Sequence, residues 1–174
     1  MPIPKINIST SNYLSADGTL QSFNTANISR KIGNIDTQAG FGFNSSTSFI
    51  SKNPTQYNFA AEASAKVKMN NDWNIKVRGR AIGDKVQGRI QVGKSIPLNE
   101  NNSIYFAGHV STTYKNSLPA NKTEHWSSNT GGWIGYTHKF DKLAISTELQ
   151  QNVNFKGKTD ASSSMLNVIL QYNF

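Results

Sequence analysis

The chain has 174 residues, a net charge of +8 and no cysteine, so disulfides and thiolate metal sites are excluded. Charged residues make up 16% and hydrophobic residues 36% of the sequence, both low for a water-soluble globular protein. No stretch approaches the roughly 18–20 consecutive apolar residues that a membrane-spanning helix requires. The composition suits turns and polar strand faces, and the regular patterning described next argues against a disordered chain.

Apolar and polar residues alternate along most of the chain. A period of two places the two kinds of side chain on opposite faces of a β-strand. The alternating segments are separated by turn signals rich in Gly, Asn, Asp and Ser. They cover residues 3–14, 19–32, 35–44, 57–69, 73–81, 86–92, 104–114, 134–140, 143–155 and 165–174. The sequence therefore predicts about ten antiparallel strands in simple up-and-down order.

Two hairpins have turns that predict their register. Gly-Asn at 33–34 is a two-residue turn of the kind that needs positive φ. If Ile32 pairs with Ile35 across it, Lys31 lies opposite Asp36, a favourable cross-strand pair.

The clearest hairpin turns at residues 70–72. If Met69 lies opposite Trp73, then Glu62 falls directly across from Arg80. The face that carries this pair is the main charged face of the predicted sheet. Its members are Glu62, Lys66, Lys68, Lys76, Arg78, Arg80 and, from the next segment, Arg89.

Connections of different length alternate along the chain. The shorter ones follow even-numbered segments and cover residues 33–34, 70–72, 95–102 and 141–142. The two longest loops, 45–56 and 115–131, follow odd-numbered segments, although short links at 15–18 and 83–85 weaken the contrast. Short turns at one rim and longer loops at the other are typical of an outer-membrane barrel.

The last ten residues alternate strictly, with Leu166, Val168, Leu170, Tyr172 and Phe174 on one face. A closing strand that ends on Phe, with an aromatic residue two positions earlier, resembles that of the bacterial outer-membrane β-barrel family. The resemblance is specific over these ten residues and architectural elsewhere. It implies a closed antiparallel up-and-down transmembrane β-barrel of about ten strands, or eight, that forms one domain over residues 1–174. It also implies the bacterial outer membrane. The first residues do not form a signal peptide, so we expect that an export signal has been removed.

A soluble barrel and a membrane barrel assign opposite directions to the same strand faces. In a soluble, lipocalin-like barrel that binds a small apolar ligand, the cations face water. In a membrane barrel they line the lumen, because a Lys or Arg at mid-bilayer costs about 2–4 kcal/mol. Aromatic residues at strand ends favour the membrane arrangement, since they would form a girdle at the membrane interface. These residues are Tyr57, Phe59, Trp73, Tyr114, Phe140, Phe155, Tyr172 and Phe174.

Few residues suggest catalysis or a cofactor. His125 with Glu124 and Ser127 or Ser128 is the one local combination that resembles the small barrel enzymes of this membrane. Serine and histidine are common in loops, so we expect no catalytic residue. The histidines have no second ligand at a useful spacing, which predicts no metal site, and no cofactor is expected. The basic face lacks interleaved aromatic residues, so nucleic acid is not an expected partner.

The sequence therefore predicts a non-enzymatic, monomeric barrel whose partners are the lipid bilayer and anionic lipid or small anions. A lumen with surplus positive charge would act as a narrow pore that favours anions. A lumen filled by hydrogen-bonded side chains would instead leave a structural or surface-display role. The solute and any surface partner cannot be read from the sequence.

Overall fold

The computed structural model describes residues 4–15, 18–50, 54–118, 124–156 and 163–173. Ten strands and one short 3-10 turn, η1 (Asn70–Asp72), account for most of them. The strands are β1 (Lys5–Ser15), β2 (Thr19–Ile32), β3 (Ile35–Ser48), β4 (Gln56–Lys68), β5 (Trp73–Ile82), β6 (Lys85–Pro97), β7 (Asn102–Lys115), β8 (Trp126–Phe140), β9 (Leu143–Lys156) and β10 (Ser163–Asn173). No helix in the described residues is long and apolar enough to cross a membrane.

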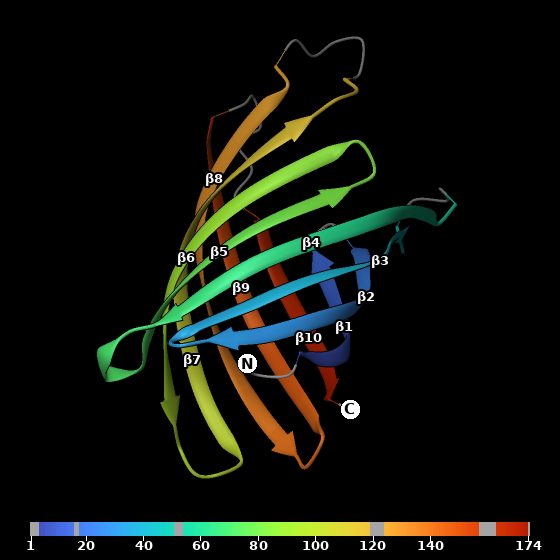
Figure 1. Cartoon of the computed structure of the whole chain (residues 1–174). Coiled ribbons are helices and arrows are strands. Elements are labelled where there is room, and N and C mark those ends of the chain that lie inside the picture. The colour runs from blue at the N-terminus through green and yellow to red at the C-terminus, as the bar shows by residue number, and fades with distance from the viewer. Residues whose placement is uncertain (1–3, 16–17, 51–53, 119–123, 157–162, 174) are drawn as a thin grey trace.

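The strands form one closed antiparallel barrel in which each strand pairs with its neighbours in sequence (Figure 1). Pairing of β1 with β10, with Leu14 opposite Leu166, completes the ring. The predicted up-and-down barrel of ten strands is thus confirmed, and the eight-stranded version is wrong. Closure leaves no unpaired strand edge, which would otherwise be open to association with another chain.

The turns position the strands as their residues predict. Ile32 pairs with Ile35 and Lys31 with Asp36 around a turn in which Gly33 has a φ of +60°. The amide of Met69 donates to the carbonyl of Trp73, 2.8 Å away, which closes the next hairpin in the predicted register. We call the rim with these turns the short-turn rim and the opposite one the long-loop rim.

Three loops are shorter than the sequence suggests. Strand β3 continues to Ser48, so the predicted loop 45–56 begins later. Strand β6 reaches Pro97, which shortens the turn 95–102. Strand β8 begins at Trp126, within the predicted loop 115–131. These extensions are mostly polar and lack regular alternation, but backbone pairing does not depend on side-chain polarity, as the pairing of Thr113 with Ser127 illustrates.

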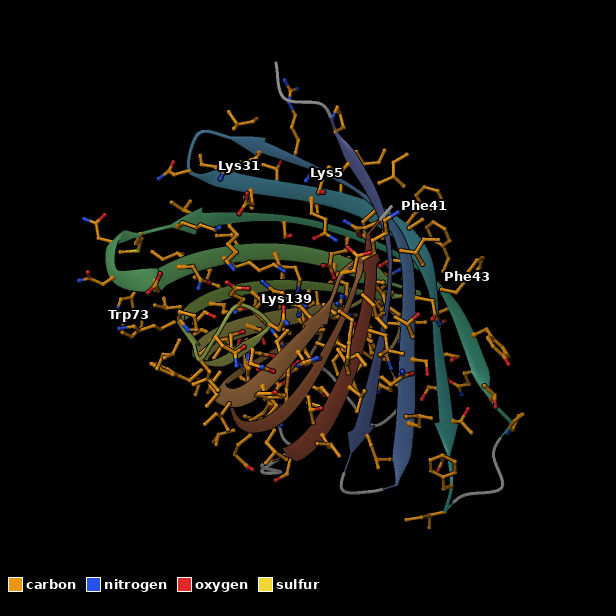
Figure 2. All side chains as sticks on the ribbon, turned by 90° about the horizontal axis from the view of Figure 1, so that it is seen from below. Lys5, Lys31, Phe41, Phe43, Trp73 and Lys139 are labelled. Atoms are coloured by element: carbon orange, nitrogen blue, oxygen red, sulfur yellow. The ribbon has the colours of Figure 1, made fainter. Side chains whose placement is uncertain are left out.

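The barrel is apolar outside and polar inside. Phe41 and Phe43 project from the outer wall, and each is 63% exposed, whereas Lys139 lies within the ring of strands (Figure 2). The buried residues of the described part are mostly polar, and Asn167 and Asn27 are only 1% and 2% exposed. A soluble barrel that encloses an apolar ligand would have the opposite distribution, so the lipocalin-like alternative is not favoured.

Two inward-facing glycines of β3 allow this strand to approach β2 closely. A Cβ built on Gly42 would lie 1.8 Å from the carbonyl oxygen of Asn24, and one on Gly40 would lie 2.1 Å from Oδ1 of Asn27. No side chain fits at such distances, so strand β3 approaches strand β2 here only because it carries glycine.

Candidate functional site

The lumen holds two cavities that meet in the middle of the barrel. The one that reaches toward the short-turn rim has a volume of about 490 Å³ and includes Thr137 and Lys139 in its lining. The one that reaches toward the long-loop rim has a volume of about 400 Å³ and includes Ser46 and Lys115. We call them the short-turn cavity and the long-loop cavity. The residues that border both are Tyr13, Arg78, Arg80, Arg89 and Gln150.

The three arginines of this shared layer come from two adjacent strands. Arg78 and Arg80 are on β5, and Arg89 is on β6 directly opposite Arg78. On the other side of β5, Arg80 lies opposite Glu62 of β4. Nearer the short-turn rim, beyond the pair of Ser64 with Arg78, Lys66 of β4 pairs with Lys76 of β5. Strands β4, β5 and β6 therefore form a strongly cationic wall of the lumen.

Glu62 is the anchor of this wall. Nε and Nη2 of Arg80 donate to Oε2 of Glu62 at 2.8 and 2.6 Å. Nη1 of Arg78 is 4.0 Å from the same oxygen, too far for a hydrogen bond. The guanidinium of Arg80 also lies over the ring of Phe23, 4.0 Å from its centroid, a cation–π contact. Arg80 is therefore fixed on two sides, and Arg78 shares the carboxylate only at long range.

Arg89 has no comparable partner. Its Nε is buried and makes no hydrogen bond to any described residue. Within the described residues, the ion pairs are those of Glu62 with Arg78 and Arg80. The contact of Arg89 is with the ring of Trp133, 5.8 Å from the guanidinium carbon. Arg78 and Arg89 thus place two like charges side by side, which is unfavourable unless an anion or water screens them.

The opposite wall is polar and nearly neutral. Glu148 of β9 accepts hydrogen bonds from the hydroxyl of Tyr105 and, at 3.1 Å, from Nδ2 of Asn167. Nε2 of Gln150 donates to Oδ1 of Asn152 at 2.7 Å. The second acidic side chain of the short-turn cavity is therefore held by neutral donors rather than by the arginines.

A hydroxyl and amide cluster on β1 and β2 fills part of the lumen. Nδ2 of Asn27 donates to the hydroxyl oxygens of Ser9 and Thr25, at 3.1 and 2.8 Å, and these two hydroxyls lie 2.8 Å apart. These groups are satisfied by one another, so they narrow the lumen without adding charge.

Several solved protein structures are similar to this barrel. LpxR from Salmonella typhimurium has a TM-score of 0.50 and 9% identity, covering 98% of this chain and 100% of that chain. The KdgM porin, solved in complex with disordered oligogalacturonate, has a TM-score of 0.48 and 13% identity, covering 97% and 99%. The NanC porin has a TM-score of 0.45 and 10% identity, covering 97% and 100%. The fold is that of bacterial outer-membrane β-barrels.

At these identities the similarity extends to the fold alone. The chain spans 62–64% of the length of the OmpT structures, an outer membrane protein of Vibrio cholerae, that it also matches. No protein-family model and no curated protein matches the sequence. The lumen and the outer wall are therefore the features of this chain that bear on its function.

Most of the charged residues singled out in the sequence line the short-turn cavity. They are Glu62, Lys66, Lys76, Arg78, Arg80 and Arg89. Lys68 shares their face but lies at the exposed end of β4 and borders neither cavity. Sequence analysis missed Tyr13, Lys115 and Lys139, although each lies on the polar parity of its strand, which was the available signal.

The aromatic residues singled out for the girdle lie near both rims. Tyr57 and Phe59 are exposed on β4 near the long-loop rim. Tyr114, near the same rim, stacks on His125 with ring centroids 5.4 Å apart. Trp73 and Phe140 are exposed near the short-turn rim. The side chains of Phe155 and Tyr172, and residue Phe174, lie outside the described part of the structure.

The combination around His125 is not arranged as a nucleophile and base. Nδ1 of His125 is 2.7 Å from the carbonyl oxygen of Lys115, so this nitrogen is the donor. The hydroxyl of Ser128 donates to Oγ1 of Thr112, 3.2 Å away. No hydrogen bond joins His125 to Ser127 or Ser128. In the part of the chain that the structure describes, no group of three or more potential metal ligands occurs.

Proposed function

We propose that this chain is a non-enzymatic barrel of the bacterial outer membrane whose basic lumen conducts small anions in preference to cations. The observation that carries the proposal is the shared layer, where three arginines border both cavities and one carboxylate, Glu62, pairs with two of them, Arg78 and Arg80. A solute that crosses from one cavity to the other must pass these charges.

Electrostatics support anion preference at this point. Lys66, Lys76 and Lys139 add positive charge on the short-turn side, and Lys85 and Lys115 add it on the long-loop side. A low-dielectric wall focuses the field of such charges into the lumen, which raises the local concentration of anions and lowers that of cations.

The outer wall supports a membrane location. Large apolar side chains from β1 to β10 are exposed on it, with aromatic residues toward both rims. In water such a surface would aggregate, whereas in a bilayer it meets lipid tails. Closure by β1 and β10 leaves no free edge, so we expect a monomer. The bilayer is the expected partner, with anionic lipid or small anions as charged ligands and no nucleic acid.

Planar-bilayer recordings in a salt gradient test the proposal. The reversal potential should show that anions permeate better than cations, and the preference should shrink at high salt because the screening length falls to about 3 Å at 1 M. The double substitution Arg78→Glu and Arg89→Glu should move the reversal potential toward cation preference. Cation preference in the unmodified protein would contradict the assignment of the basic wall.

A second candidate is a structural barrel with a closed lumen. The hydrogen-bonded cluster of Ser9, Thr25 and Asn27 and the shared layer both narrow the path. A correctly folded protein that gives no conductance in the same recordings would favour this candidate over the pore.

A further inference from the structure

Arg78 and Arg89 form a pair of guanidinium groups that the protein neutralises only in part, since Arg78 reaches Glu62 at 4.0 Å and Arg89 forms no ion pair with a described residue. They occupy directly opposed positions on β5 and β6, where Cβ atoms lie about 4.5–5.5 Å apart. The two acidic side chains nearby are engaged elsewhere, since Glu62 binds Arg80 and Glu148 accepts from Tyr105 and Asn167. The buried Nε of Arg89 still lacks a partner among the described residues.

Burial makes this arrangement costly without a ligand. The side chain of Arg78 is only 15% exposed, and Arg89 is half-buried beside the ring of Trp133. A buried donor without an acceptor loses its hydration, and two adjacent cations repel each other. A ligand that supplies both negative charge and several acceptor oxygens would relieve both effects.

The chemistry of the pair selects among anions. Each guanidinium is a planar fork of donors that matches the spacing of oxygens in a carboxylate, sulfate or phosphate. Tyr13 borders both cavities at the same layer, and its phenol can donate one more hydrogen bond. A spherical halide can use the charge but not the fork geometry.

We propose that Arg78 and Arg89 together form a binding site for one polyatomic oxoanion at the junction of the two cavities. The site rests on the proposed function to the extent that the ligand arrives through the basic lumen. Because both arginines border both cavities, the anion can reach the site from either rim and leave by the other.

Titration of sulfate into the folded barrel tests the site without requiring conduction. Isothermal titration calorimetry in detergent, with sodium sulfate replacing sodium chloride at constant ionic strength, should show saturable binding of one sulfate per chain. Arg78→Gln and Arg89→Gln should each weaken the affinity about tenfold or more, because hydrogen bonds to charged groups are removed. Arg30→Gln is the matched control, since Arg30 lies on the outward parity of β2 beside Ile28 and borders neither cavity.

Arg89→Lys separates the site from the general charge of the lumen. The substitution keeps the positive charge but removes the fork, so the sulfate affinity should fall although the charge of the lumen is unchanged. Equal sulfate affinity in the Lys and Arg forms would overturn the proposal and leave anion preference standing. Sulfate binding that survives both Gln substitutions would also overturn it. If the unmodified protein binds sulfate but shows no anion preference, the proposed pore function is contradicted and the binding site is not.

Discussion

At the scale of single residues, the lumen depends on one carboxylate. Glu62 is 11% exposed and holds Arg80 by two hydrogen bonds, with Arg78 at 4.0 Å. Its register opposite Arg80 could be predicted from the turn at 70–72, since a known turn length determines every pair in the hairpin. The contact of Arg80 with Phe23 could not, because nothing local in the sequence relates β2 to β5 across the lumen.

Substitution of Glu62 by Gln should destabilise the barrel by about 1–3 kcal/mol, because Arg78 and Arg80 would be left as adjacent cations with a neutral neighbour. Urea unfolding in lipid vesicles would measure the change. Glu100→Gln, in the exposed turn between β6 and β7, removes the same charge and should have little effect. An unchanged unfolding free energy for Glu62→Gln would show that the lumen tolerates its arginines without a counter-charge.

At the scale of elements, alternation predicts the parts of the strands whose outer face is apolar and fails where that face is polar. Residues Ser127 to Gly132 of β8 lack apolar side chains, so the sequence predicts a loop there although these residues pair with β7. Contacts between loops likewise cannot be predicted from the sequence. The hydroxyl of Ser117 donates to the carboxylate of Asp84, and the amide of Asn116 donates to the Asp84 carbonyl at 2.9 Å. Ser117 and Asp84 are 33 positions apart in the sequence.

The contact between Asp84 and Ser117 should weaken in acid. The hydrogen bond from Ser117 lowers the pKa of the Asp84 carboxyl below its ordinary value. A lowered pKa means that the contribution to stability is complete above the ordinary pKa of about 3.9 and is lost as the pH falls through the lower folded value. Amide exchange at Asn116, corrected for intrinsic rates, should therefore lose protection below about pH 4.

Asp84→Asn should remove this pH dependence, because the amide cannot be protonated in that range. Asp141→Asn, in the turn at the opposite rim, should leave the exchange at Asn116 unchanged. Protection at Asn116 that is the same at pH 3 and pH 6 in the unmodified protein would show that the carboxylate does not hold the loop.

At the scale of the whole molecule, the main feature of the barrel is that its outer wall is apolar and its lumen is polar. The direction of each face could be predicted because cations on β4 to β6 cannot meet lipid, and closure was implied by the resemblance of the last ten residues to the closing strand of an outer-membrane barrel. The cationic wall could be predicted, because its residues lie on three consecutive segments. The contacts between strands that are not neighbours could not, and they include Tyr105 with Glu148 and Arg89 with Trp133, which only the closed ring brings together.

Leu149 tests the direction of the outer face, because a charge placed there should destabilise strongly in a bilayer and hardly at all in water. It lies in the middle of β9, is 62% exposed, and pairs with Ile134 and Leu166 on the outer wall. In a bilayer, Leu149→Arg should destabilise by about 2–4 kcal/mol, the cost of an arginine near the midplane. In a water-soluble barrel the same change on an exposed surface would lie within about 0.5 kcal/mol of neutral. Unfolding in vesicles measures it, with Asn70→Arg in the exposed turn before β5 as the control, and a neutral Leu149→Arg would place this face in water.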